Sequence, residues 1–203
     1  KKHSKNACSN APASVAALKL YKATDNEAYL TAGKELYAWC YATLHDEEDD
    51  LFFDNMSLTG RISRAKYSYN SGQMIEAGAM LYDLTGEERY LKQAQATAAG
   101  CYERWFKPMK DGEQEFRMME SGDVWFDAVM LRGLIALYEQ DKNDTYLQAV
   151  NRSLDYAWRM GRDEHGLFGK FLSHRREEDK RSWLLTQAAY AEMSARMAKV
   201  NLR

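Results

Sequence analysis

The sequence predicts an all-α protein built as an array of αα-hairpins. Composition is the first observation that favours this class, because the 203 residues include only 2 prolines and many alanines, leucines, glutamates and lysines, which are good helix formers. The second observation is an internal repeat of helix–turn–helix units. The third is a regular alternation between short polar turns and long loops.

The repeat is a Leu-Tyr pair followed, after a polar turn, by a Tyr-Leu pair. The two tyrosines of a unit are 8 residues apart in each case: Tyr21 and Tyr29, Tyr82 and Tyr90, Tyr138 and Tyr146. The first two turns also carry the Thr-x-x-Glu spacing of a capping box, from Thr24 to Glu27 and from Thr85 to Glu88. Each unit is therefore predicted to form a helix, a short turn and a second helix.

Helical periodicity predicts seven helices in one domain that spans residues 1–203. Asn10, with Pro12 behind it, predicts the start of the first helix, and Asn70 or Ser71 predicts the N-cap of the third. Long loops are expected at 44–71, 107–123 and 161–181, all at one end of the array, where a site can be built on a rigid scaffold. The expected helices are 11–23, 28–43, 72–84, 88–106, 124–140, 146–160 and 182–198.

Charge and composition narrow the classes of partner. Lys and Arg number 28 and Asp and Glu 30, which argues against nucleic acid or an anionic membrane as the main partner. No apolar window is long enough to span a bilayer. The chain begins at Lys1 without an initiator methionine or a signal peptide, so we expect a mature or trimmed piece of a longer protein.

The cysteines and histidines give no sign of a metal site. Cys8, Cys40 and Cys101 form no Cys-x-x-Cys pair, and we expect all three to be buried free thiols. The four histidines show no His-x-x-x-His spacing. We therefore expect neither a metal nor a cofactor.

One segment stands out as a candidate ligand site. Residues 67–73 are aromatic and polar, and they lead into a predicted helix with small residues at 77–79. This junction presents tyrosine, asparagine and glutamine side chains beside a helix N-terminus, which suits a polyhydroxylated ligand. An ordinary capped helix start is the alternative.

Four segments together resemble glycoside hydrolase family 76, the bacterial endo-α-1,6-mannanases with fungal cell-wall relatives. They are residues 6–12, the Phe-Phe-Asp-Asn loop at 52–55, the Tyr-Ser-Tyr-Asn-Ser-Gly segment at 67–72, and residues 126–133. The resemblance implies an (α/α)6 toroid of twelve helices, of which this chain holds about seven. Two positions depart from the pattern: Ser71 stands where the family often has glutamine, and Gln73 where threonine or a small residue is usual.

The resemblance also implies catalysis by two consecutive aspartates in a motif upstream of Lys1, so the catalytic residues are not expected in this chain. Asp49-Asp50 is the only consecutive pair here. It lies in an acidic run without an aromatic scaffold, and we interpret it as a solvated loop.

The resemblance implies a set of substrate-binding residues. It places Asp54 in the sugar subsite beside the cleaved bond, with an Asx turn as the alternative. Tyr69 and Asn70 match the family's Tyr-Asn, and Gln73 lies one helical turn further on. Asn6 and Asn10 are candidates to face the groove, with N-capping as the alternative for Asn10.

Trp125 and Phe126 begin a predicted helix, where a flat ring could stack on the C–H face of a sugar; a core role is the alternative. Arg132 lies mid-helix, and we assign it a structural role in pairing with a buried carboxylate.

The expected function is therefore cleavage of α-mannan by a two-carboxylate retaining mechanism, with this chain supplying the sugar-binding half of the groove. Seven helices leave an open helix face, which a dimer or a missing N-terminal segment would have to cover. The alternatives are a non-catalytic carbohydrate-binding or scaffold module, and another (α/α)6 sugar enzyme. The substrate class implies export to the periplasm or cell surface, although the chain carries no such signal.

Overall fold

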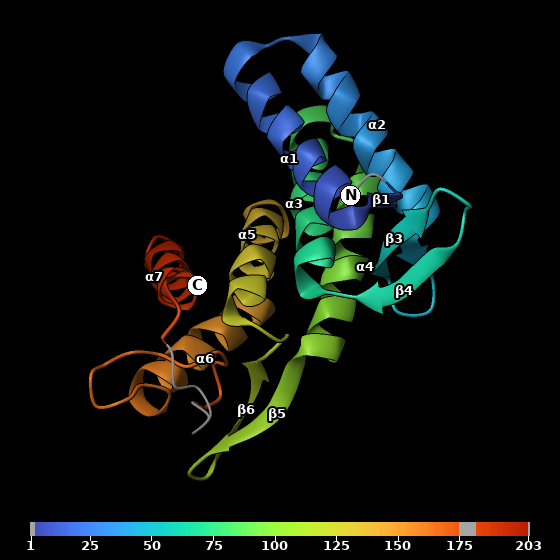
Figure 1. Cartoon of the computed structure of the whole chain (residues 1–203). Helices are drawn as coiled ribbons and strands as arrows, with labels where there is room; N and C mark the ends of the chain where they lie inside the picture. The colour runs from blue at the N-terminus through green and yellow to red at the C-terminus, as the bar shows by residue number, and fades with distance from the viewer. Residues whose placement is uncertain (1–2, 175–181, 203) are drawn as a thin grey trace.

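The computed structural model describes residues 3–174 and 182–202, and most of these form helices (Figure 1). The seven expected helices are confirmed to within a few residues at most of their ends. They are α1 (Ala7–Thr24), α2 (Glu27–Leu44), α3 (Ser68–Thr85), α4 (Glu88–Trp105), α5 (Val124–Asp141), α6 (Thr145–Met160) and α7 (Leu184–Met197). Among the described residues, no helix combines the length and apolar character that a membrane span requires.

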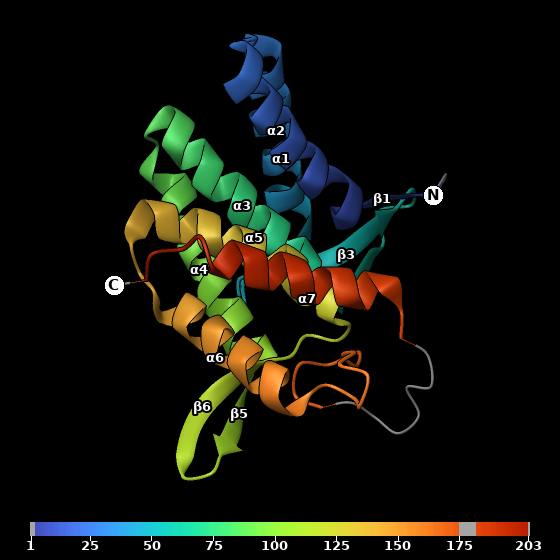
Figure 2. The ribbon, with the colours of Figure 1, turned by 90° about the vertical axis from the view of Figure 1, so that its left-hand side faces the viewer.

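The odd-numbered helices form a row, α1–α3–α5–α7, in which each contacts the next (Figure 2). Helix α2 packs on α1, and α4 packs on α3. The closest approach in the row is between α3 and α5. A Cβ atom on Gly72 would lie 2.5 Å from the Cα of Met130, and one on Gly133 would lie 2.2 Å from the carbonyl oxygen of Gly72. Glycine is required at both positions because the neighbouring atoms are backbone.

The repeat has a common structural basis in the three short turns. Each odd-numbered helix before such a turn ends at a residue in the left-handed conformation, whose N–H donates to the carbonyl of the repeat tyrosine four residues earlier. Left-handed caps of this kind satisfy carbonyls that the helix end leaves unpaired. The pairs are Asp25 to Tyr21, Gly86 to Tyr82 and Lys142 to Tyr138.

The predicted capping boxes are wrong, because both threonines belong to the helix before the turn. The hydroxyl of Thr24 donates to the carbonyl of Leu20, and that of Thr85 to the carbonyl of Leu81, both at 2.7 Å. Helix α2 is instead capped by Asn26, whose side chain accepts from the N–H of Ala28.

Two predicted helix starts are also wrong. Helix α1 begins at Ala7 behind the N-cap Asn6, so Asn10 and Pro12 lie inside it. The Asn10 amide donates to the carbonyl of Asn6 at 2.8 Å instead of capping a free N–H. Helix α3 begins at Ser68, which places Asn70 and Ser71 in its first turn.

The chain is not purely helical, because two of the long loops contain strands. Strand β3 (Leu51–Ser57) pairs antiparallel with β1 (Ser4–Asn6), β2 (His45–Asp46) and β4 (Ile62–Lys66). Strands β5 (Phe106–Asp111) and β6 (Gln114–Met119) form a separate hairpin. These loops bury apolar side chains such as Phe52 and Met119, and strand pairing satisfies the backbone polar groups that are buried with them.

The core has two parts, one on each side of α3. The first lies between α1, α2 and α3 around Leu18, Phe52 and Leu81. The second lies between α3 and α7 around Leu131 and Tyr190. Cys40 and Cys101 are buried free thiols as predicted, but Cys8 is exposed, so that part of the prediction is wrong.

Candidate functional site

The N-terminal ends of α1, α3 and α5 meet around a pocket of about 340 Å³. Three predicted site residues, Tyr69, Gln73 and Trp125, line it. Sequence reasoning did not assign the other lining residues to a ligand site. Helical spacing could have found them, since Cys8 and Pro12 are one turn apart on α1 and Val129 is one turn beyond Trp125. The lining is Cys8, Pro12, Tyr69, Gln73, Trp125 and Val129.

Four aromatic side chains from two helix starts pack together at this end of the molecule, and we call them the aromatic platform: Tyr67, Tyr69, Trp125 and Phe126. The rings of Tyr67 and Tyr69 stack with centroids 5.3 Å apart, and those of Tyr69 and Trp125 stack with centroids 5.5 Å apart. Phe126 meets Tyr69 and Trp125 edge-on, at 4.7 and 4.2 Å. These offset-stacked and edge-to-face contacts are the favourable arrangements of aromatic pairs.

Asp54 comes to the same region from strand β3. It lies within the strand, at an irregularity in the pairing with β4, so the Asx-turn alternative is wrong. The amide of Asn55 donates to its carboxylate at 2.6 Å. Burial, followed by the negative charge of Asp54, raises the pKa of Tyr69 to about 12, so the Tyr69 hydroxyl keeps its proton at neutral pH.

Asn6 and Asn10 lie at the junction of β1 and α1. The Asn6 side chain is almost fully buried, accepts from the hydroxyl of Ser4 at 3.2 Å and donates to the carbonyl of Ser4 at 3.3 Å. Asn10 directs its amide to the carbonyl of Asn6. Both amides therefore make local hydrogen bonds, and their contact with a sugar stays a prediction.

Asn70 is completely buried, like Ser68 and Ser71 beside it in α3. Neither its Oδ1 nor its Nδ2 has a hydrogen-bond partner among the described residues. A buried amide without partners costs about 1–3 kcal/mol. Asn70 is not among the residues that line the pocket, and its sugar contact also stays a prediction.

Comparison with known proteins assigns the chain to a family. The model of glycosyl hydrolase family 76 matches residues 1–121. The chain belongs to glycosyl hydrolase family 76. No curated protein sequence matches it.

Solved structures of family 76 proteins resemble the chain over nearly its full length. A family 76 mannosidase, Bt3792 of Bacteroides thetaiotaomicron, is 34% identical with a TM-score of 0.90, covering 96% of this chain and 55% of its own. The α-1,6-mannanase GH76A of a Salegentibacter species is 27% identical with a TM-score of 0.78, covering 96% and 60%. This family 76 chain therefore spans about half the length of the solved structures it matches.

An inactive variant of the Salegentibacter enzyme, in which two consecutive aspartates are replaced by asparagine, was solved with α-1,6-mannotriose. It is 28% identical to the present chain with a TM-score of 0.81, and the match covers 97% of this chain and 60% of that one.

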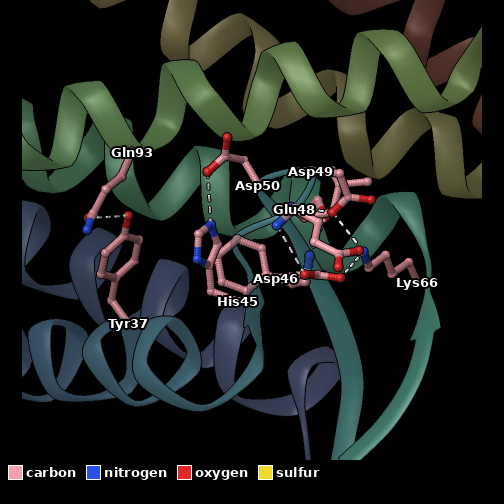
Figure 3. A network of polar contacts seen from close by, with 11 residues as sticks. Tyr37, His45, Asp46, Glu48, Asp49, Asp50, Lys66 and Gln93 are labelled. Carbon is pink, nitrogen blue, oxygen red and sulfur yellow. Dashed lines mark hydrogen bonds and ion pairs between the residues drawn. The ribbon is translucent and has the colours of Figure 1, made fainter.

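The consecutive aspartates of the present family 76 chain, Asp49 and Asp50, are held apart by different partners (Figure 3). Asp49 pairs with Lys66 at 2.7 Å, and Lys66 also pairs with Asp46. Asp50 lies 3.2 Å from the Nε2 of His45. The acidic run is a turn that Lys66 ties to β4. Glu47 and Glu48 are exposed, as the solvated-loop interpretation predicts, whereas Asp46 and Asp49 are partly buried in their ion pairs with Lys66.

A set of hydrogen-bonded polar groups beside the platform was missed by sequence reasoning; Ser68 and Asp127 are buried, and Ser121 is half-buried. The Ser68 and Ser121 hydroxyls are 2.5 Å apart, and Ser121 donates to Asp127. Asp127 is completely buried, and this desolvation raises its pKa from 3.8 to about 7. Its position inside the apolar run at 124–131 is the signal that could have found it.

Two further expectations concern polar side chains. Arg132 forms a two-pronged ion pair with Glu192, at 2.7 and 2.8 Å, so the predicted pairing is confirmed, although Glu192 is half-buried. Among residues 3–174 and 182–202, no group of three or more His, Cys, Asp or Glu side chains could hold a metal ion.

Proposed function

We propose that this family 76 chain forms the sugar-binding part of an α-1,6-mannan-cleaving groove. The observation that carries the proposal is the pocket that Tyr69 of α3 and Trp125 of α5 line together, with Asp54 of β3 near enough for its charge to raise the pKa of Tyr69. A sugar offers C–H faces that stack on aromatic rings. It also offers hydroxyls, which make strong hydrogen bonds to a carboxylate.

Each residue has a distinct part in the proposed groove. Asp54 accepts hydrogen bonds from mannose hydroxyls, as the family resemblance implies. Tyr69, with its hydroxyl protonated, donates to a sugar oxygen, while its ring and that of Trp125 support the C–H face. Gln73, one turn into α3, adds an amide at the pocket wall. The ligand of the proposal is a mannan-type oligo- or polysaccharide, and the substrate class favours export to the periplasm or cell surface.

Cleavage needs two carboxyl groups, which in a retaining enzyme lie about 5 Å apart. No carboxylate is among the residues that line the pocket within the described part of the chain. Asp49 and Asp50 line a different recess, against α4. The acid and the nucleophile are therefore proposed to come from the part of the family 76 fold that this chain does not span.

The test is to mix the 203-residue chain with α-1,6-mannotetraose and to follow both binding, by calorimetry, and chain shortening. Binding without cleavage is expected. The variants Asp54→Ala and Trp125→Ala should each weaken binding about tenfold, as the loss of a charged hydrogen bond or of a stacked ring would. Asp83→Ala is the matched control, since it removes a carboxylate at the far end of α3, where Asp83 is exposed and pairs with Lys22.

Three results would contradict the proposal. A chain that does not bind the tetrasaccharide does not hold the groove. Equal binding by wild type and Asp54→Ala would remove Asp54 from the site. Cleavage by this chain would place the acid and nucleophile within it, and it would return attention to Asp49 and Asp50.

A further inference from the structure

A chain of part-buried hydrogen bonds lies beside the aromatic platform and joins the starts of α3 and α5. Ser68, in the first turn of α3, lies 2.5 Å from Ser121, measured between hydroxyl oxygens. Ser121 gives both its hydroxyl and its backbone N–H to one oxygen of Asp127, at 2.5 and 3.1 Å. We call this chain of three residues the serine–aspartate bridge.

The bridge alternates in sequence with the platform. Ser68 stands between Tyr67 and Tyr69, and Asp127 directly follows Phe126. Successive residues at a helix start point in different directions, so one residue can enter the interior while its neighbour stays at the surface. Ser68 and Asp127 are indeed completely buried, whereas Tyr69 and Trp125 line the pocket. The bridge and the platform are therefore two faces of the same helix junction.

We propose that Asp127 is a positioning residue for sugar binding, because through Ser121 and Ser68 it fixes the start of α5 against that of α3 and so sets the separation of Trp125 and Tyr69. The inference rests on the proposed function, since the ligand is the mannooligosaccharide of that pocket. Asp127 itself touches no sugar, being buried.

Packing alone accounts poorly for a carboxyl group at this position. Asp127 makes no ion pair, and its second oxygen has no hydrogen-bond partner among the described residues. The charged and titratable groups that act on it are Glu120 and Asp123, which are also acidic, and Asp127 acts in turn on Tyr190. Burying such a group costs free energy unless its hydrogen bonds offset the cost. Both hydrogen bonds of Asp127 come from Ser121, which in turn contacts Ser68 of α3.

The starts of α3 and α5 need contacts of their own, because the close glycine contacts between these helices lie one turn further along. Gly72 meets Met130, one turn beyond Ser68 and Asp127. At the helix starts the two helices are joined instead by side chains, namely the stacked rings of the platform and the serine–aspartate bridge. Loss of the bridge should therefore loosen the platform without separating the rest of α3 and α5.

The experiment compares Asp127→Ala and Asp127→Asn with wild type by two readouts. One is the affinity for α-1,6-mannotriose. The other, measured without sugar, is the near-ultraviolet circular dichroism of the stacked rings, with Trp125→Ala defining the contribution of Trp125. Asp127→Ala should weaken the affinity about tenfold, because the sugar would then have to order a loosened platform, and reduce the Trp125 signal. Asp127→Asn keeps an acceptor for Ser121 and should restore both.

Ser153→Ala is the matched control. Ser153 is also completely buried and also joins two elements, because its hydroxyl oxygen accepts from the N–H of Met119 in β6 at 2.9 Å. Its loss should lower the melting temperature and leave both readouts unchanged. If Asp127→Ala fails to fold, Ser68→Ala takes its place, because it removes only the hydrogen bond between Ser68 and Ser121. It should show smaller losses of affinity and of the Trp125 signal.

The outcomes separate this inference from the proposed function. If wild type, Asp127→Ala and Ser68→Ala all bind the trisaccharide with the same affinity, the inference is overturned and the proposed function stands. A loss of affinity in Ser153→Ala as large as that in Asp127→Ala would overturn it too. Wild type that does not bind the trisaccharide would overturn the proposed function, and this inference with it.

Discussion

The two ends of the odd-numbered helices differ in how they are built. At the short-turn end, three turns repeat one solution, in which a left-handed residue donates to a repeat tyrosine. At the other end, each described connection is different: a four-stranded sheet leads into α3, and a hairpin leads into α5. The short-turn end uses one repeated connection, whereas the pocket, the aromatic platform and the serine–aspartate bridge all lie at the other end.

Helix α3 shows the contrast within one element. Near its start, Gly72 is pressed against the backbone of Met130. At its end, Gly86 has φ +68° and no atom within 4 Å of an added Cβ. The first glycine is required by packing against α5 and the second by backbone conformation alone, so substitutions at the two ends should have unequal costs.

The largest expected effect is that of Gly72→Ala. The added methyl would lie 2.5 Å from the Cα of Met130, and backbone cannot yield as a side chain can, so the free energy of unfolding should fall by about 3 kcal/mol or more. Gly86→Ala is the control at the other end and should cost about 1 kcal/mol, because only left-handed strain is added. Urea denaturation measures both, and equal losses would contradict the contrast.

The next effect concerns pH. Burial raises the pKa of Asp127 from 3.8 to about 7, so the folded chain binds more protons than the unfolded chain between these values. The stability that this carboxyl group contributes is fully present below pH 3.8 and is lost as pH rises towards 7. Asp127→Asn removes the titration. The free energy of unfolding of wild type, relative to this variant, should fall between pH 4 and 7.5 by about 2 kcal/mol, within the limit of about 4 that the shift allows. Parallel pH profiles of the two proteins would contradict this.

Ion pairs at the two ends give a smaller contrast. The Lys66 side chain is 9% exposed and serves Asp46 and Asp49, whereas Lys22 is 49% exposed beside Asp83. Lys66→Met should lower the free energy of unfolding by about 1 kcal/mol or more, because it leaves Asp46 without an ion pair and Asp49 with only Arg104, 4.0 Å away. Lys22→Met should cost less than about 0.5 kcal/mol, as exposed pairs do. Thermal unfolding of the two variants measures the difference, and a larger loss for Lys22→Met would contradict the account.

The same contrast explains what the sequence could predict. The helices were predictable because the Leu-Tyr and Tyr-Leu pairs mark the short turns directly. The strands were not, since β3 depends on a pairing between Asn55 and Asn6, which are far apart in sequence. Asp54-Asn55 has the composition of a turn, and only that pairing makes it a strand.

The candidate site was predictable in part. Tyr69 was found because it lies at a helix start in a segment that resembles family 76, and Gln73 and Trp125 because they directly flank such segments. The burial of Asn70 could not be found in this way, because it depends on how the neighbouring helix packs, and that of Asp127 is indicated only by its position inside the apolar run at 124–131. Asn10 and Pro12 suggested a helix start at a place where backbone pairing of β1 with β3 had already fixed Asn6 as the N-cap.

The most direct test of the account asks whether a sugar reaches the pocket beside Trp125. The five tryptophans can be labelled as 5-fluorotryptophan, with the Trp125 signal assigned from Trp125→Phe, and titrated with α-1,6-mannotriose in a fluorine NMR experiment. The account predicts that the Trp125 resonance shifts while that of Trp158, which is exposed on α6, stays in place. A shift of Trp158, which packs against Phe168, with Trp125 unmoved would place the sugar elsewhere at the long-loop end and contradict the assignment of the groove to the pocket beside Trp125.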